Sequence, residues 1–165
     1  MTNITFKGNP ISTIGALPAK GTTPKFTLTK NDLSEISSKD LRGQKVILNI
    51  YVSLDTPVCS LSVQKFNDKK NELENVNVVC VSADLPFAAT RFCDAAQINN
   101  AIITSTFRHP EFGKNFGVTI AEGPLQGLLS RAIVVLDEKG KVLYSEQVAE
   151  VTNEPDYAAA IAAAT

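Results

Sequence analysis

VILNIYVSLDTPVCS, residues 46–60, joins a run of apolar residues to the start of a helix. The run Val46–Val52 is typical of a buried strand, because it is short and rich in β-branched residues. Thr56 suits the N-cap of the helix that follows, and Pro57 suits its first position. A buried strand that leads into a helix within a few residues is typical of an α/β fold, and here the turn between the two carries Cys59.

The rest of the chain repeats this order and then changes to antiparallel strands. Crossover helices between buried strands, followed by a hairpin, predict a mixed central sheet flanked by helices. We expect one thioredoxin-like α/β domain over residues 1–165, with an N-terminal β-hairpin. The segments behind this expectation are a hairpin of Ile4–Lys7 and Ile11–Ile14, a β-like piece at Lys25–Thr29, a polar loop over residues 34–40, a strand at Val76–Val81, a helix from Pro86 to about Gln97 capped by Asp84, a short apolar piece at Ala101–Thr104, a short helix between His109 and Gly117, a hairpin of Ala132–Leu136 and Val142–Ser145, and an alanine-rich helix from Pro155.

Composition excludes several classes of protein. The formal net charge is −1 and no long run of Lys or Arg occurs, so neither nucleic acid nor an anionic membrane is an expected partner. The N-terminus has no basic region followed by a long apolar one, and no apolar run is long enough to span a membrane, so we expect a cytoplasmic protein. Three cysteines are too few and odd for a secreted disulfide scaffold, which favours a redox or catalytic use.

Cys59 is the leading candidate nucleophile. It would occupy the third position of the predicted helix, where unpaired amides and the positive end of the helix dipole favour a thiolate over a thiol. The nearby Asp55 would oppose that effect. The alternative is a small hydrophobic residue of the core, as many free cysteines are.

Thr56 decides which reaction Cys59 suits. The order of the elements matches a thioredoxin-like fold with its redox cysteine after the first core strand, but a dithiol oxidoreductase would need a second cysteine where Thr56 stands. A hydroxyl beside the thiolate suits a small oxygen-containing substrate. The thiolate would attack the O–O bond of a peroxide, become a sulfenic acid and expel alkoxide or water. We expect the Thr56 hydroxyl either to hydrogen-bond the peroxide or to be used as the helix cap.

Cys93 is the candidate thiol for resolving that sulfenic acid. The alternative is an inert cysteine on the core face of its helix. A disulfide needs Cα atoms within about 7 Å of each other. Cys93 lies seven residues beyond Pro86, about 10 Å along a helix, so both cysteines cannot easily lie near two helix N-termini. We therefore predict that the reduced protein holds the two sulfurs apart and that local unwinding accompanies oxidation.

For each of the other candidate residues, a structural role is one of the interpretations. Cys80 lies inside a predicted strand and is expected to be structural. Arg131 opens the last hairpin, either as a solvated strand end or as a cation that would stabilise the Cys59 thiolate and the departing oxygen. His109 is the single histidine and so the only imidazole base for a cysteine hydrolase, but its place before Pro110 favours a structural role. No Cys-x-x-Cys or His-x-x-x-His pair predicts a metal site, and Gly123–Gly127 lacks the lysine of a phosphate-binding loop, so no cofactor is expected.

Seven motifs spread over nearly the whole chain resemble those of one family, the bacterial thiol peroxidases, which form the atypical two-cysteine branch of the peroxiredoxins. They are Asp55-Thr56-x-Val58-Cys59, Ser82-Ala83-Asp84-Leu85-Pro86-Phe87, Arg91-Phe92-Cys93, Ser105-Thr106-Phe107-Arg108, Gly123-Pro124-Leu125-x-Gly127-Leu128, Arg131-Ala132 and Glu154-Pro155-x-Tyr157. The resemblance implies a homodimer that reduces hydrogen peroxide and, preferably, organic hydroperoxides, with thioredoxin as the electron donor. It implies that Cys59 is the peroxidatic cysteine, that Cys93 of the same subunit resolves it, and that Thr56 and Arg131 activate it.

The chain departs from the family pattern at two places. Val52 stands where the family has a proline that shields the sulfur, so we expect a retained pocket with an altered rate or substrate preference. The stretch Asp94–Gln97 replaces a small, glycine-containing sequence, which is expected to stiffen the helix and slow disulfide formation. The rival hypothesis is a redox-sensing or partner-binding module of the same fold, in which the disulfide changes shape instead of turning over peroxide.

Overall fold

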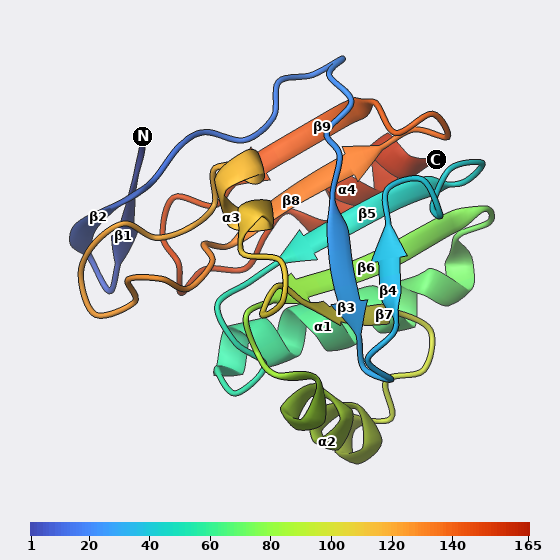
Figure 1. The fold of residues 1–165 in the computed structure, drawn as a ribbon, viewed down its shortest axis with the longest axis horizontal. Helices are drawn as coiled ribbons and strands as arrows, with labels where there is room; N and C mark the ends of the chain where they lie inside the picture. The colour runs from blue at the N-terminus through green and yellow to red at the C-terminus, as the bar shows by residue number, and fades with distance from the viewer.

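A computed structural model describes residues 1–165 and contains one large sheet, a separate hairpin and four α-helices (Figure 1). The strands are β1 (Thr2–Phe6), β2 (Asn9–Thr13), β3 (Thr27–Lys30), β4 (Glu35–Ser37), β5 (Lys45–Ile50), β6 (Val76–Ser82), β7 (Ile102–Ser105), β8 (Ala132–Leu136) and β9 (Val142–Gln147). The helices are α1 (Pro57–Lys69), a 3-10 turn η1 (Lys70–Glu72), α2 (Pro86–Ala96), α3 (Glu111–Phe116) and α4 (Tyr157–Ala164).

The large sheet has seven strands in the order β4-β3-β7-β6-β5-β8-β9. The pairs β5·β6 and β6·β7 are parallel, and the other four pairs are antiparallel, so the predicted mixed sheet is confirmed. Parallel neighbours end at the same edge of a sheet. The chain segments that follow β5, β6 and β7 therefore meet at one edge, and the first of them carries Cys59.

Helices cover both faces of the sheet, and two apolar clusters fill the space between. One cluster joins α1 and α4 to one face and includes Val63, Phe66 and Ala160, with α2 packing against it through Ala89. The other joins α3 to the opposite face through Phe112 and Phe116. In Figure 1, α1 and α4 lie behind the sheet and α3 lies in front of it. Because both faces are covered, all of β5 beyond Lys45 is buried, which explains why every one of these residues except Asn49 is apolar.

The N-terminal hairpin lies beside one end of the sheet and is tied to two later loops (Figure 1). The Thr5 amide donates to Ala149 O at 2.7 Å, and the Ile14 amide donates to Thr119 O at 2.8 Å. The predicted hairpin is confirmed. No helix of the chain is long and apolar enough to cross a membrane.

Two local predictions were wrong. The segment predicted as a polar loop contains β4, because Ile36 is buried and pairs with Leu28 of β3. Asp84 does not cap α2, whose N-cap is Leu85 without a side-chain hydrogen bond. A strand of three residues with a single buried side chain carries too little periodicity for the sequence to reveal it.

Candidate active site

Cys59 lies in the first turn of α1, as predicted. Pro57 is the first helical residue and Thr56 is the N-cap, so Cys59 is the third residue of the helix. The side chain is fully buried in the apolar cluster under α1 and its thiol is free. A sulfur at this position faces the unpaired amide groups of the helix start, which favour negative charge.

The Thr56 hydroxyl does not cap the helix. It donates a hydrogen bond to Ser53 O at 2.8 Å, and the helix start has no side-chain cap. Its only hydrogen is therefore committed, while its lone pairs remain available to accept a bond. Since Thr56 and Cys59 line the same cavity, an O–H group bound there could donate to this oxygen.

Arg131 is buried beside the sulfur, with only 1% of its surface exposed. Its Nη2 donates to Cys59 Sγ at 3.0 Å and its Nε donates to Val151 O at 2.9 Å. Its Nη1 is buried without a hydrogen-bond partner. The backbone is also held, because Arg131 O accepts from Gln147 Nε2 and from the Val148 amide. Of the two readings left open by the sequence, the cation that points into the fold is the one observed.

The cavity at Cys59 has a volume of about 120 Å³ and a mainly apolar wall. It is lined by Phe6 of the hairpin, Val52, Thr56, Pro57, Val58, Cys59, Leu125, Arg131, Val151 and Thr152. The cavity lining thus combines the buried Cys59 and Arg131 with apolar side chains from the hairpin, the start of α1 and later loops. This arrangement fits a small ligand that has one polar, reactive end and an apolar body.

Asp84 is a residue of the site whose role the sequence did not suggest. Its carboxylate accepts hydrogen bonds from Ser53 Oγ at 2.7 Å, from the Leu54 amide at 2.8 Å and from Ser82 Oγ at 2.8 Å. It therefore ties the end of β6 to the loop that precedes Thr56. The available signal was a carboxylate directly after a buried strand, at the sheet edge where neighbouring loops meet.

Cys93 lies on α2, as predicted, but the structure does not bring it to Cys59. Both thiols are free, and Cys93 is partly buried in a different recess that Asn31, Ile98 and Ala101 also line. Asn31 Nδ2 donates to its sulfur at 3.7 Å. Burial raises the pKa of the Cys93 thiol, an effect that the Asn31 contact partly offsets. No disulfide joins the two cysteines, and they line different recesses, which agrees with the predicted separation of the sulfurs in the reduced protein.

The other candidate residues do not join the site. Cys80 is buried inside β6, burial raises the pKa of its thiol to about 12, and Asn49 Nδ2 donates to its sulfur at 3.7 Å. His109 contacts the carboxylates of Glu35 and Glu111 and no cysteine. No group of three or more metal-ligating side chains occurs.

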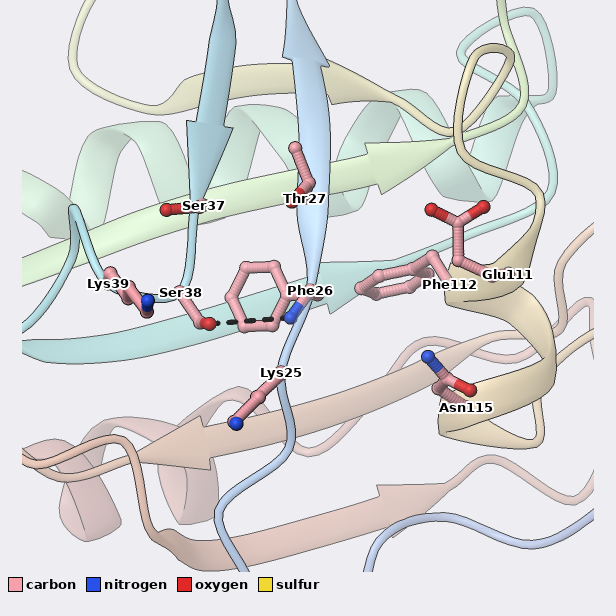
Figure 2. Close-up of a pocket in the computed structure, with 9 residues that line it drawn as sticks. All are labelled: Lys25, Phe26, Thr27, Ser37, Ser38, Lys39, Glu111, Phe112 and Asn115. Carbon is pink, nitrogen blue, oxygen red and sulfur yellow. Dashed lines mark hydrogen bonds between the residues drawn. The ribbon is translucent and has the colours of Figure 1, made fainter.

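A larger recess of about 450 Å³ lies on the opposite side of the sheet (Figure 2). Phe26 and Phe112 form its apolar part, and Lys25 and Lys39 stand at its rim. It is open, contains no cysteine, and is separated by the sheet from Cys59. We assign it no part in the chemistry at that sulfur.

Comparison with known proteins supports this interpretation of the fold and places the chain in a family. The redoxin family model matches residues 18–161. The thiol peroxidase of Mycobacterium tuberculosis is 52% identical over 164 residues, which cover 99% of this chain and 98% of that protein, and the Mycobacterium bovis thiol peroxidase matches equally well. The structure of a peroxiredoxin-like protein from Aquifex aeolicus superposes with a TM-score of 0.92 at 36% identity, over 99% of this chain and 96% of that one.

A thiol peroxidase from Chromobacterium violaceum shares the fold with a TM-score of 0.88 at 24% identity, over 95% of this chain and 91% of that one. The predicted thioredoxin-like fold is confirmed by these neighbours together with the family match. The full-length identity to curated thiol peroxidases also decides against the sensor as the sole role. The chain therefore belongs to the redoxin family, and within it to the thiol peroxidases, which are peroxidase enzymes of the peroxiredoxin type.

Proposed function

We propose that Cys59 is the peroxidatic cysteine of a single-domain, thioredoxin-dependent hydroperoxide reductase. The observation that carries this proposal is the buried contact of Arg131 Nη2 with Cys59 Sγ at 3.0 Å, between two residues that line an apolar cavity. A guanidinium held against a buried sulfur stabilises the thiolate more than the thiol. No other cysteine of the chain has a cationic partner among its hydrogen bonds.

The first step breaks the O–O bond of the peroxide. The Cys59 thiolate attacks one oxygen and forms an S–O bond, the sulfur is oxidised to a sulfenic acid, and the other oxygen leaves as alkoxide or hydroxide and takes up a proton. Arg131 Nη1, buried without a partner, would donate to the oxygen that becomes negative. Thr56 Oγ1 would accept from the peroxide O–H, because its own hydrogen is given to Ser53 O. Apolar side chains around the cavity suit an organic hydroperoxide as well as hydrogen peroxide.

The second step joins Cys59 to Cys93 of the same subunit and releases the sulfenic oxygen as water. Because the two cysteines lie in different recesses, at least one of α1 and α2 must unwind locally before the sulfurs can meet. A thioredoxin dithiol would then reduce the disulfide and restore both thiols.

The test is a coupled assay with cumene hydroperoxide, thioredoxin, its reductase and NADPH. Cys59→Ser should abolish NADPH oxidation, whereas Cys80→Ser should retain at least half of it.

Cys93→Ser should form one sulfenic acid, trapped by dimedone, and then stop turning over with thioredoxin. Peptide mapping of the wild type after one equivalent of peroxide should show Cys59 linked to Cys93. Linkage to Cys80 or to another chain would exclude the resolving role of Cys93.

We further propose that the protein acts in the cytoplasm as a homodimer. Leu85 and Phe87 after β6, and Phe107 after β7, are large apolar side chains that remain 54%, 72% and 43% exposed at one edge of the sheet. A second copy would cover such a surface. Light scattering should give twice the chain mass, and Phe87→Asp should give the monomer.

A further inference from the structure

The peptide group that joins Val151 to Thr152 links Arg131 to a carboxylate. Its carbonyl oxygen, Val151 O, accepts from Arg131 Nε at 2.9 Å. Its amide, Thr152 N–H, donates to Glu150 Oε2 at 2.8 Å. A trans peptide is planar, with N–H and C=O pointing in opposite directions, so the Glu150 oxygen that holds one end also sets where the other end points.

The second carboxylate oxygen of Glu150 holds the N-terminal hairpin. Glu150 Oε1 accepts from the Gly8 amide at 2.8 Å and from Thr5 Oγ1 at 3.0 Å. The main chain reinforces this contact, since the Val151 amide donates to Thr5 O at 2.9 Å. Phe6, between these two hairpin residues, forms part of the cavity wall.

We propose that Glu150 is a positioning residue for the peroxidase reaction: through one carboxylate it aims the Val151 carbonyl that orients Arg131 on Cys59, and it holds Phe6 in the cavity wall. This inference rests on the proposed role of Cys59. Glu150 touches neither the sulfur nor the cavity, and its effect passes through the 151–152 peptide and the hairpin.

Only an ionised carboxylate can satisfy all of these donors. Its two oxygens accept from the amides of Thr152 and Gly8 and from the hydroxyls of Thr152 and Thr5. These bonds, the Thr152 amide first, lower the pKa of Glu150 to about 2, so the acceptor stays ionised at any working pH. A glutamine would turn an NH₂ group toward donors on one of the two sides.

An effect of the Glu150 charge and an effect of its hydrogen bonds predict opposite changes at the Cys59 thiolate when Glu150 is replaced. Removal of a negative charge near Arg131 would by itself favour the thiolate, because the guanidinium would then act on Cys59 with less opposition. Loss of positioning would disfavour the thiolate, because Arg131 would lose the acceptor that fixes its direction. Glu154 and Tyr157 also act electrostatically on Arg131 or Cys59, and both remain in every variant used below.

Glu122 provides a matched control. Its Oε1 accepts from Ser12 Oγ at 2.9 Å, so it also ties the hairpin to a later loop by a carboxylate. It has no contact with the 151–152 peptide. Loss of a carboxylate charge beside the hairpin should affect Glu122→Gln and Glu150→Gln alike, whereas the proposed role is confined to Glu150.

The experiment measures thiolate formation at Cys59 and not turnover. In a background with Cys80 and Cys93 changed to serine, the rate of alkylation by iodoacetamide is followed from pH 4 to 10 in Glu150→Gln, Glu150→Asp and Glu122→Gln. Stopped-flow oxidation by cumene hydroperoxide at pH 7 gives the second-order rate constant. Circular dichroism and thermal unfolding check that each variant is folded.

Glu150→Gln should raise the pH midpoint of alkylation by about one pH unit and lower the rate constant about tenfold. Glu150→Asp keeps the charge but shortens the side chain, and should shift in the same direction. Glu122→Gln should stay within twofold of the parent. A midpoint that is unchanged or lower in both Glu150 variants, or an equal effect of Glu122→Gln, would overturn the proposal. The proposed function fails separately, if Cys59→Ser retains peroxidase turnover.

Discussion

Every N–H donor of a buried guanidinium needs a hydrogen-bond acceptor, and only two of the three nitrogens of Arg131 have one. Nε and Nη2 donate to Val151 O and to Cys59 Sγ, while Nη1 is left unpaired. A buried donor without a partner costs on the order of 1–3 kcal/mol. An unsatisfied group beside a reactive sulfur is characteristic of a site whose ligand supplies the missing bond.

Arg131→Lys tests whether the three nitrogens of the guanidinium are needed. A single ammonium cannot contact the Val151 carbonyl, the sulfur and an oxyanion in the fork geometry of arginine. We expect the second-order rate constant with cumene hydroperoxide to fall about 100-fold, as for the loss of one preorganised donor. Arg108→Lys, at an exposed ion pair with Glu35, is the control and should keep the wild-type rate. A rate within twofold of wild type in Arg131→Lys would contradict the role of the guanidinium.

Among the helices and strands, α2 is the helix that carries Cys93, and the way it ends determines what must open if it unwinds. Pro86 starts it, and Gln97 ends it in the left-handed conformation, with a φ of 56°. The amides of Gln97 and Ile98 both donate to Cys93 O, so the helix cap is built on the carbonyl of the cysteine itself. Any movement of Cys93 toward Cys59 that unwinds α2 must therefore open this cap.

Gln97→Gly should stabilise the reduced protein by about 1 kcal/mol, because a side chain in the left-handed region costs roughly that much and glycine does not. Urea unfolding of the reduced protein measures the difference. Ala96→Gly, one residue earlier and inside the helix, is the matched control and should destabilise by about 0.5–1 kcal/mol. Equal effects of the two substitutions would show that the left-handed cap is not strained.

For the whole molecule, carboxylates that join distant parts of the chain predict acid sensitivity. Hydrogen bonds from Thr152 and Gly8 lower the pKa of Glu150 to about 2, and the hydrogen bond from Lys65 lowers the pKa of Glu154. Each pKa lies below the ordinary value of 4.5, so each group stabilises the fold above that pH. The contribution of Glu150 is lost as the pH falls from 4.5 toward 2, and that of Glu154 is lost as the pH falls below 4.5.

We expect the melting temperature to fall over that pH range, and to fall less steeply in Glu150→Gln, which has no carboxyl group to protonate at this position. Thermal unfolding by circular dichroism at pH 6, 4 and 2 gives the two curves. Each curve is compared with its own value at pH 6, so a general destabilisation by the substitution does not affect the comparison. Parallel curves for the two proteins would contradict the assignment.

The sequence predicted the elements of the fold well where apolar runs and helix caps lay within a few residues of each other. The apolar run before Cys59 and the Thr56-Pro57 start are local features, and α1 begins at the predicted residue. The strand β4 was missed because only one of its three residues, Ile36, is buried, and that residue is buried where β4 pairs with β3. Asp84 was wrongly predicted to be a cap because its partners, Ser53 and Leu54, are 31 and 30 residues away in the chain.

Local patterns in the sequence were enough to predict the core strands and the helices that follow them, the place of Cys59 at a helix start, and the presence of Thr56 where a dithiol site would have a second cysteine. These features depend on neighbours within a few residues, where helix caps and apolar periodicity act. The folded structure was needed to show that Arg131, 72 residues later, touches the sulfur, and that Glu150 holds both the hairpin and the 151–152 peptide. Such contacts arise from packing of distant segments against one sheet, and no local pattern encodes them.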